Sequence, residues 1–378
     1  MKVALIETDG DGDSLLKGLA ERLGSEEAVL NVESGAERKT VKIPFAGHRE
    51  ALQVFAERMG AFQPVAVGHR VVHGGEEFTG SVRITSAVIE AVQRCSSLAP
   101  LHNPANLIGI QTAQELFPGV PHVAVFDTAF HQSLPAHAYL YALPYHFYED
   151  MKVRRYGFHG TSHQFVSFEA ALILGKNPHA ASFITMHLGN GCSACAVKDG
   201  RSVDSTMGLT PSEGLMMGTR SGDVDPALHQ FLHDRTGMPL GEITALLNSR
   251  SGLLGLSGLS NDMRTLAQAS AEGNERASLA IEVFCYRLAK AVCGLTAALE
   301  HLEALVFTGG IGENSAFVRE HAAAYWNILG VRLDSQANAA NGRKTQGLIS
   351  SRDSVLKCLV VPTNEELMIA RETLNLLG

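Results

Sequence analysis

The stretch FITMHLGNGCSACAV (183–197) decides the fold class, because it reads as a strand, a glycine loop and a second strand. Phe183–Leu188 is a mostly apolar run of the length that buried strands have. His187–Gly191 follows with two glycines, and Cys195–Val197 predicts the next strand. We therefore expect a buried sheet whose loop exposes backbone amides that can approach an anion.

On both sides of this stretch, similar short apolar runs alternate with helical patterns along the whole chain. Further strands are predicted at Val3–Ile6, Ala28–Val32, Val41–Pro44, Val65–Val72, His122–Phe126, Leu305–Thr308 and Leu356–Val361. Helices are predicted at Ala51–Met59, Asn106–Leu116, Ala277–Leu302 and Glu365–Leu377. Strands that alternate with helices predict an α/β protein.

Two of these helices have an apolar face that we expect to be buried. In the first, Leu52, Phe55 and Met59 share one face. In the longest, the residues in phase are Leu279, Val283, Tyr286 and Ala289.

One segment near the N-terminus can be read in two ways. Leu15, Leu16, Leu19 and Leu23 have helical spacing with Gly24 as a stop, but the segment could equally be the second arm of a hairpin. The preceding Asp9–Asp13 contains two Asp-Gly pairs, which are a strong hairpin signal. A calcium loop is excluded, because Ala20 stands where the bidentate glutamate belongs.

Composition excludes several classes of protein. With 378 residues, 45% hydrophobic and 19% charged, the chain predicts two globular domains. The net charge of −8 and the lack of a basic stripe argue against nucleic acid as a partner. The apolar runs fall far short of the ~20 residues of a membrane helix, and only four apolar residues separate Lys2 from Glu7, so no signal peptide is visible. We expect a soluble, cytoplasmic protein without a membrane partner.

The six cysteines do not predict a disulfide framework in a chain this long. Cys192 and Cys195 form a C-x-x-C, but no second pair or suitably spaced histidines follow to complete a zinc site. We expect buried, reduced thiols on a strand.

Three glycine-rich segments follow predicted strands: His187–Gly191, Gly218–Asp223 and Gly309–Asn314. None is a Walker P-loop or a dinucleotide G-x-G-x-x-G. Each alone is typical of a tight turn, but three on one chain favour a protein that handles phosphate.

Histidine and arginine gather in three short segments, at 69–75, 101–104 and 158–163. His159 and His163 are four apart, but no glutamate lies between them as a zincin motif requires, so a metal site is disfavoured. The histidines beside glycine or arginine in loops are the best candidates for chemistry.

Together these segments resemble the acetokinase family, the acetate kinases and their propionate and butyrate kinase relatives, within the acetate and sugar kinase/Hsp70/actin superfamily. The matching stretches extend from about residue 60 to the end of the chain: VGHRVVHGGEEFTG (67–80), LAPLHNPAN (98–106), VAVFDTAFHQSLP (123–135), RRYGFHGTSH (154–163), HLGNGCSACAVKDGRSVDSTMGLTPSEGLMMGTRSGDVDP (187–226), FTGGIGENS (307–315) and VPTNEELMIARET (361–373).

The resemblance implies two actin-like (ribonuclease H-like) α/β domains with a cleft between them. The first would span residues 1–150 and be completed by the C-terminal helix 363–378, and the second, which binds nucleotide, would span 151–362. The partners implied are a small carboxylate, a nucleotide and a second copy of the chain in a homodimer.

The implied reaction is reversible, in-line phosphoryl transfer from ATP to a short-chain carboxylate, acetate or propionate, giving an acyl phosphate and ADP. The nucleophile needs no general base, because a carboxylate is already ionised at pH 7. The site must instead neutralise charge on the transferring phosphoryl group, which calls for Arg, Mg²⁺ and hydrogen-bond donors. Histidines and arginines in the matching segments suit that demand.

Roles carry over from the family by matching position. Arg70 corresponds to the arginine that pairs with the substrate carboxylate, and Asp127 to an aspartate that orients arginine or metal-bound water. The transition-state stabilisers correspond to Arg220 and His159, with His102 as a further active-site histidine. The small acyl pocket corresponds to Val72, Leu101, Phe158 and Pro211.

The nucleotide and its metal ion are assigned in the same way. The phosphates would lie along His187, Leu188, Gly189, Asn190 and Gly191, and the adenosine along Asp262, Met263 and Arg264 together with Gly310, Ile311, Gly312, Glu313 and Asn314. Glu365 corresponds to a glutamate associated with Mg²⁺ (or Mn²⁺), for which carboxylate oxygen is a suitable ligand.

The N-terminus departs from the family pattern. The family usually begins with a strand and an Asn-Ala-Gly-Ser-Ser-Ser-Leu-Lys phosphate loop, whereas Lys2–Glu7 aligns best with the family's second strand, leaving only Lys2 of that motif. Two expectations follow: either the true start lies upstream of Met1, or the chain is a catalytically impaired, nucleotide-binding relative.

Overall fold

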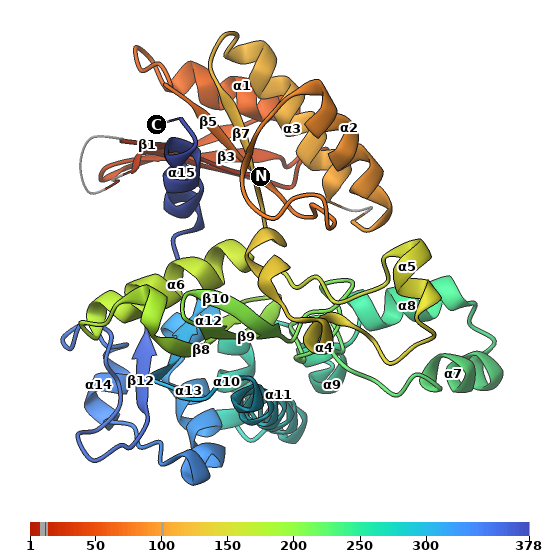
Figure 1. The fold of residues 1–378 in the computed structure, drawn as a ribbon, viewed down its shortest axis with the longest axis vertical. Helices are drawn as coiled ribbons and strands as arrows, with labels where there is room; N and C mark the ends of the chain where they lie inside the picture. The colour runs from red at the N-terminus through yellow and green to blue at the C-terminus, as the bar shows by residue number, and fades with distance from the viewer. Residues whose placement is uncertain (8–11, 13, 100–101, 378) are drawn as a thin grey trace. The chain divides into compact units, whose positions relative to one another are not determined.

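The computed structural model describes residues 1–7, 12, 14–99 and 102–377. The chain divides into two compact units, residues Met1–Ala129 with Asn364–Gly378, and Phe130–Thr363. Figure 1 colours the first unit red to orange, with the C-terminal helix in dark blue. The division precedes the predicted boundary near residue 150, because the segment after Phe130 bonds to the second unit: the Ser133 hydroxyl donates to the Ser202 carbonyl at 2.8 Å.

The first unit contains two sheets and the helices that cover them. Its elements are β1 (Lys2–Ile6), β2 (Ser14–Glu21), β3 (Val29–Ser34), β4 (Glu37–Lys42), α1 (His48–Arg58), β5 (Val67–Val71), β6 (Val82–Arg83), α2 (Ser86–Arg94), α3 (Asn103–Leu116), β7 (His122–Phe126) and α15 (Glu365–Asn375). The first four strands pair antiparallel in chain order, and β7 pairs parallel with β5 and antiparallel with β6.

The ambiguous segment after the N-terminal turn is a strand, the second arm of a hairpin with β1. Leu16 and Ala20 of β2 are buried, whereas Lys17 and Leu19 are exposed, which is the alternation of a strand with one covered face. Apart from Gly12, the turn predicted at Asp9–Asp13 lies outside the described residues.

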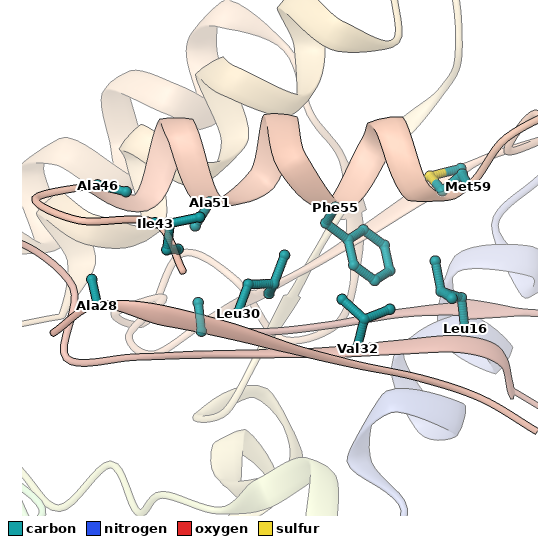
Figure 2. Close-up of a cluster of buried hydrophobic side chains, with 10 residues drawn as sticks. Leu16, Ala28, Leu30, Val32, Ile43, Ala46, Ala51, Phe55 and Met59 are labelled. Carbon is teal, nitrogen blue, oxygen red and sulfur yellow. The ribbon is translucent and has the colours of Figure 1, made fainter. Parts of the chain in front are cut away.

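Helix α1 covers the first sheet with a face close to the predicted one: Phe55 and Met59 are in the buried cluster as expected, but Ala51 takes the place predicted for Leu52, which is only partly buried. Figure 2 shows Phe55 pointing toward Leu30 and Val32 of β3, and Met59 lying above Leu16 of β2. Gly18 of β2 makes this contact possible, because a Cβ there would lie 2.6 Å from the Phe55 ring.

Helix α15 packs on β5, β7 and β1 (Figure 1). Gly68 of β5 allows the approach, since a Cβ there would lie 2.4 Å from Thr373 Oγ1 and 2.6 Å from Ile369 Cγ2. The first turn of the helix, with Glu365, is thereby held next to the strand that carries Arg70.

The second unit is built on one five-stranded sheet in the order β10-β9-β8-β11-β12. Its strands are β8 (Ser182–Leu188), β9 (Cys192–Lys198), β10 (Arg201–Ser205), β11 (Ala304–Thr308) and β12 (Lys357–Val360). Its helices are α4 (Ala136–Tyr139), α5 (His146–Met151), α6 (Gly160–Ile173), α7 (Leu228–Thr236), α8 (Leu240–Ser249), α9 (Gly252–Ser257), α10 (Met263–Ala271), α11 (Glu275–Leu295), α12 (Gly309–Asn314), α13 (Ala316–Ala323) and α14 (Ser335–Ala339). β8 and β9 form the strand–loop–strand unit predicted at 183–197.

Two predictions about this unit were wrong. Helix α11 ends at Leu295 rather than Leu302. It buries Ile281, Phe284 and Leu288; of the predicted face Ala289 is buried, but Leu279 and Tyr286 are about half exposed. This helix has apolar residues on two faces, and packing selected the face with the larger continuous stripe. Gly218–Asp223 does not follow a strand but lies in irregular backbone well after β10.

The cysteine prediction is confirmed. Cys192 and Cys195 are free thiols on β9, and both are buried. Burial raises the pKa of each thiol to about 12, so both are protonated and unreactive.

Candidate active site

In the first unit, an arginine and two carboxylates lie at the carboxyl ends of the parallel strands β5 and β7. Arg70 is the penultimate residue of β5 and Asp127 directly follows β7. The Arg70 Nε donates to Asp127 Oδ1 at 2.9 Å, and Nη2 donates to Oδ2, so the pair is bidentate. Glu365 Oε2 lies 3.7 Å from Arg70 Nε. The structure therefore brings together three of the predicted site residues of this unit.

The positive charge of Arg70 is neutralised by the carboxylates beside it. The Asp127 side chain is 2% exposed and that of Arg70 is 41% exposed. Attraction by Asp127 raises the pKa of Arg70, against the opposing effect of burial, and Glu365 adds to the attraction. Arg70 is thus permanently charged and fixed in orientation.

The segment after Arg70 is tied to the start of α3. The Val72 amide donates to Asn106 Oδ1 at 3.1 Å, and Asn103 both accepts from the His73 amide and donates to the His73 carbonyl. Val72, predicted in the acyl pocket, is buried. His102 is exposed just before α3, and Leu101 lies outside the described residues.

In the second unit, His159 and Arg220 converge on Gly191. A Cβ at Gly191 would lie 3.4 Å from Arg220 Nη1 and 3.6 Å from His159 Nε2. His159 precedes α6 with a positive φ of 57°, a conformation that non-glycine residues rarely adopt and that often marks functional sites. Its ring stacks on His187, with the centroids 4.2 Å apart.

Arg220 is held by neutral groups. Its Nη1 donates to the Pro211 carbonyl at 3.0 Å and lies 3.6 Å from Met217 Sδ. Burial lowers the pKa of Arg220. Among the described residues no carboxylate forms an ion pair with it, so an anion brought to this guanidinium would replace a missing countercharge.

Arg155 stiffens the loop that carries Pro211. Its Nη1 donates to the Ser205 carbonyl at 2.7 Å and its Nη2 contacts Glu213 Oε1 at 2.5 Å. The Tyr141 hydroxyl donates to the other Glu213 oxygen. Phe158, also predicted in the acyl pocket, is buried, and its carbonyl accepts from His131 Nε2 at 3.0 Å.

The three glycine-rich segments meet at the end of β8. The Gly218 amide donates to the Asn190 carbonyl at 3.0 Å, and a Cβ at Gly309 would lie 2.8 Å from the Leu188 carbonyl oxygen. Gly309 has φ +75°, and only glycine fits both this conformation and this close approach. The end of β8 thus lies beside Gly309 and Gly312 of α12. That His187, Leu188, Gly189, Asn190 and Gly191 form one binding surface with Gly310, Ile311 and Gly312 stays a prediction.

Three charged residues assigned to the adenosine have structural partners. Glu313 Oε1 accepts from the Gly309 and Thr363 amides, at 2.9 and 3.1 Å, so it fixes the start of α12. The Asn314 side chain donates from Nδ2 to the Gly310 carbonyl at 3.0 Å. Asp262 caps α10 and pairs with the exposed Arg264, whose hydrogen bonds lower the pKa of that carboxyl to about 2; Met263 is buried.

Several residues of the site were not found from the sequence. Asn261 Nδ2 donates to Asn190 Oδ1 at 2.9 Å and joins α10 to the phosphate loop. The fully buried Arg319 donates to the Gly312 carbonyl at 2.8 Å. Ser193 accepts or donates at His159 Nδ1, 2.8 Å away. A polar residue directly after Gly191-Cys192 is a weak signal, and only the three-dimensional contacts reveal its role.

The described residues contain no group of three or more His, Cys, Asp or Glu that could enclose a metal ion. Mg²⁺ bound with nucleotide needs fewer protein ligands, because it keeps several waters and is held by one or two carboxylates plus phosphates. Glu365, half-buried and close to Arg70, fits that more limited role. In the part of the chain that the structure describes, no helix is long and apolar enough to cross a membrane.

Comparisons with known proteins identify the family of this chain. The model of the acetokinase family matches residues 1–371, further toward the N-terminus than the motifs alone indicated. An acetate kinase of Ectopseudomonas mendocina is 55% identical over 96% of this chain and 92% of that protein. One from Deinococcus deserti is 53% identical over 100% of this chain and 95% of its own length.

Solved structures show the same fold. A propionate kinase of Francisella tularensis superposes with a TM-score of 0.94 at 43% identity, covering 99% of this chain and 96% of that one. The acetate kinase of Porphyromonas gingivalis gives a TM-score of 0.92, also at 43% identity, covering 100% and 96%. The predicted α/β fold with two actin-like domains is confirmed.

With a family match over nearly the whole chain, relatives above half identity and a shared fold, the chain belongs to the acetokinase family and is an enzyme of the acetate kinase type, a phosphotransferase whose acceptor is a carboxyl group.

Proposed function

We propose that the enzyme phosphorylates acetate, and propionate as a second substrate, with ATP, by direct and reversible in-line transfer that yields the acyl phosphate and ADP. Membership of the family supports ATP-dependent phosphorylation of a carboxylate. The observation that carries the finer proposal is the convergence of Arg220 and His159 on Gly191, beside the glycine-rich end of β8. Cationic donors around a backbone loop suit a transferring phosphoryl group.

Arg70 binds the substrate carboxylate. A guanidinium has five N–H donors, and in the described part of the chain Asp127 accepts two of them. The remaining donors can meet a second carboxylate in the same planar, bidentate manner. Asp127 orients the arginine and does not abstract a proton, because the substrate carboxylate is already ionised at neutral pH.

His159 and Arg220 stabilise the charge that spreads over the phosphoryl oxygens during transfer. Arg220 contributes a cation that is not offset by the neutral groups it contacts. The nucleotide lies along the end of β8 and α12, where Gly189 and Gly191 are partly exposed and Gly310 is exposed. His102 serves as a further histidine near the substrate.

Glu365 holds Mg²⁺ (or Mn²⁺), directly or through water. When bound, the ion neutralises phosphate charge and helps to align the transferring group. Glu365 lies in the first turn of α15, and Asn364 caps that helix by accepting from the Leu367 amide at 3.0 Å, so its position is fixed.

By resemblance to the family, selectivity between acetate and propionate depends on a small apolar acyl pocket. Such a pocket separates acids that differ by one methylene by only ~1–3 kcal/mol. We therefore propose acetate as the preferred substrate and measurable activity with propionate. We also propose a cytoplasmic homodimer, by resemblance to the family, which light scattering of the purified protein tests.

An acyl-hydroxamate assay with acetate, propionate and butyrate tests the function. We expect ATP- and Mg²⁺-dependent product with acetate, and less with each longer acid. Nucleotide binding without product from any of the three acids would instead support a catalytically impaired relative. Product with none of the acids and no nucleotide binding would contradict both readings.

A further inference from the structure

A chain of hydrogen bonds between buried side chains leads from His159 into the interior of the second unit. His159 Nδ1 lies 2.8 Å from Ser193 Oγ, and the same hydroxyl lies 2.8 Å from His163 Nε2. His163 Nδ1 in turn lies 2.7 Å from Thr185 Oγ1. Ser193, His163 and Thr185 are fully buried and come from β9, α6 and β8. Three elements of the fold thus support one histidine ring.

The last hydroxyl sets the direction of this chain. The Thr185 hydroxyl donates to the Cys195 carbonyl, at 3.5 Å, so its oxygen accepts from His163 Nδ1–H. Burial lowers the pKa of His163 well below its ordinary value, so this ring is neutral and carries one proton. With that proton on Nδ1, His163 Nε2 must accept, and the Ser193 hydroxyl donates to it.

The direction then passes to His159. Because the Ser193 hydroxyl donates its only hydrogen to His163, its oxygen must accept a hydrogen bond from His159 Nδ1–H. We propose that Ser193, His163 and Thr185 are positioning residues that hold the proton of neutral His159 on Nδ1. The other ring nitrogen, Nε2, faces Gly191 and would lie 3.6 Å from a Cβ placed there. In this tautomer His159 can donate from Nε2 only after it gains a second proton and becomes cationic.

This inference rests on the proposed function for its meaning: His159 stabilises the transferring phosphoryl group as a cation beside Arg220, not as a neutral donor. Among the described residues, the stacked neighbour His187 and the more distant His163 face His159, with ring centroids 4.2 and 6.5 Å away. His187 Nδ1 is engaged by the Ser162 hydroxyl at 2.8 Å, in a hydrogen-bond network of its own.

The tautomer of His159 is directly measurable. In the full-length protein labelled with ¹⁵N-histidine, and without substrates, long-range ¹H–¹⁵N correlation spectra distinguish a protonated ring nitrogen from an unprotonated one. The His159 signals are identified by their loss in His159→Gln. At a pH where His159 is neutral we expect the proton on Nδ1; finding it on Nε2 overturns the proposal.

A distant substitution provides the sharper test. Thr185→Val keeps the β-branched shape in β8 but removes the hydroxyl, so His163 Nδ1–H loses its acceptor. His163 should then carry its proton on Nε2 and donate to Ser193. The Ser193 hydroxyl is then free to donate to His159 Nδ1, so the proton of neutral His159 should be found on Nε2. The matched control Thr185→Ser keeps the hydroxyl and should retain the wild-type tautomer. If the substitutions acted only by changing the packing, the His159 tautomer would not be reversed in Thr185→Val and retained in Thr185→Ser.

Removal of the linking hydroxyl completes the test. In Ser193→Ala the added Thr185→Val change should no longer affect the His159 tautomer, and a persistent effect would show that the coupling does not pass through Ser193. These spectra do not depend on turnover. If the hydroxamate assay fails but the tautomer reverses as expected, the proposed function is wrong and the positioning chain stands; the opposite pair of results rejects the chain alone.

Discussion

The two units each present one arginine to an anion, and the two arginines are held in opposite ways. In the first unit Arg70 is paired with Asp127 through two hydrogen bonds and lies near Glu365, and this attraction raises its pKa. In the second unit Arg220 donates to a backbone carbonyl and contacts a sulfur, and burial lowers its pKa. One charge is neutralised within the fold, whereas the other is not.

This difference assigns different tasks to the two residues. An arginine that is already paired binds a further carboxylate weakly but in a fixed orientation, which suits a small substrate that must leave as product. A desolvated arginine without a countercharge gains most when negative charge appears beside it, which is the demand of phosphoryl transfer. Substitutions at the two positions should therefore separate binding, turnover and stability.

The largest expected effect is on turnover when Arg220 is removed. Arg220→Ala should lower kcat by about 10²–10³-fold, the usual loss for one donor to a developing charge, with a smaller change in KM for acetate. The measurement is steady-state kinetics of hydroxamate formation. As a control, Arg332→Ala removes an exposed arginine of the same unit, paired with Asp353, and should leave kcat unchanged. An equal loss in both variants would contradict the special role of Arg220.

A smaller effect is expected on stability, and its sign should differ between the two arginines. Arg70→Met leaves the buried Asp127 carboxylate without its partner and should destabilise the first unit by roughly 2–3 kcal/mol, less than for a fully buried pair, because water screens the half-exposed arginine. Arg220→Met removes a cation that has no countercharge and should be neutral or stabilising. Denaturant unfolding measures both variants.

The double variant Arg70→Met/Asp127→Asn checks the cause. Because it also removes the stranded charge, it should recover part of the stability lost in Arg70→Met. If the double variant is less stable than the single one, the loss at Arg70 comes from packing rather than from charge.

Much of this contrast could be predicted from the sequence, because motif residues lie where strands end. Parallel strands with Arg70 and Asp127 at their carboxyl ends must bring the two side chains to one edge. Gly309 likewise marks a close approach that only glycine tolerates, since a Cβ there would lie 2.8 Å from the Leu188 carbonyl oxygen. These features are local or follow from strand pairing, so they can be predicted from a single sequence.

Other features depend on packing between distant segments and were missed or wrong. The sequence shows two apolar faces on α11 but not that Ile281 and Phe284, rather than Leu279 and Tyr286, face the core. Glu313 looks like a ligand for nucleotide, yet its carboxylate accepts from two backbone amides. The support of His159 by Ser193 joins residues from different elements, and no spacing rule encodes it.

At mildly acid pH, the smallest expected effect is on the stability of the first unit, beside Arg70. His69 Nε2 lies 2.9 Å from His122 Nδ1, and burial, with repulsion from His122, lowers the pKa of His69 to about 3. The unfolded chain, in which histidine has a pKa near ~6.5, therefore binds a proton that the folded unit rejects. Stability should be fully present above about pH 6.5 and fall as the pH decreases toward 3, by up to ~1.4 kcal/mol per pH unit for this one group.

His69→Gln removes one titrating group and should flatten this dependence between pH 6.5 and 4, while His73, whose pKa burial lowers to about 4, keeps part of it. Hydrogen exchange of the β5 and β7 amides measures the first unit separately; fluorescence cannot, because the single tryptophan, Trp326, belongs to the second unit. Above pH 7 the two proteins should show parallel pH dependence, since the imidazole is then neutral in both folded and unfolded states. If the slopes below pH 6.5 are also parallel, His69 is protonated in the folded unit, and the acid sensitivity of the strand that carries Arg70 has another source.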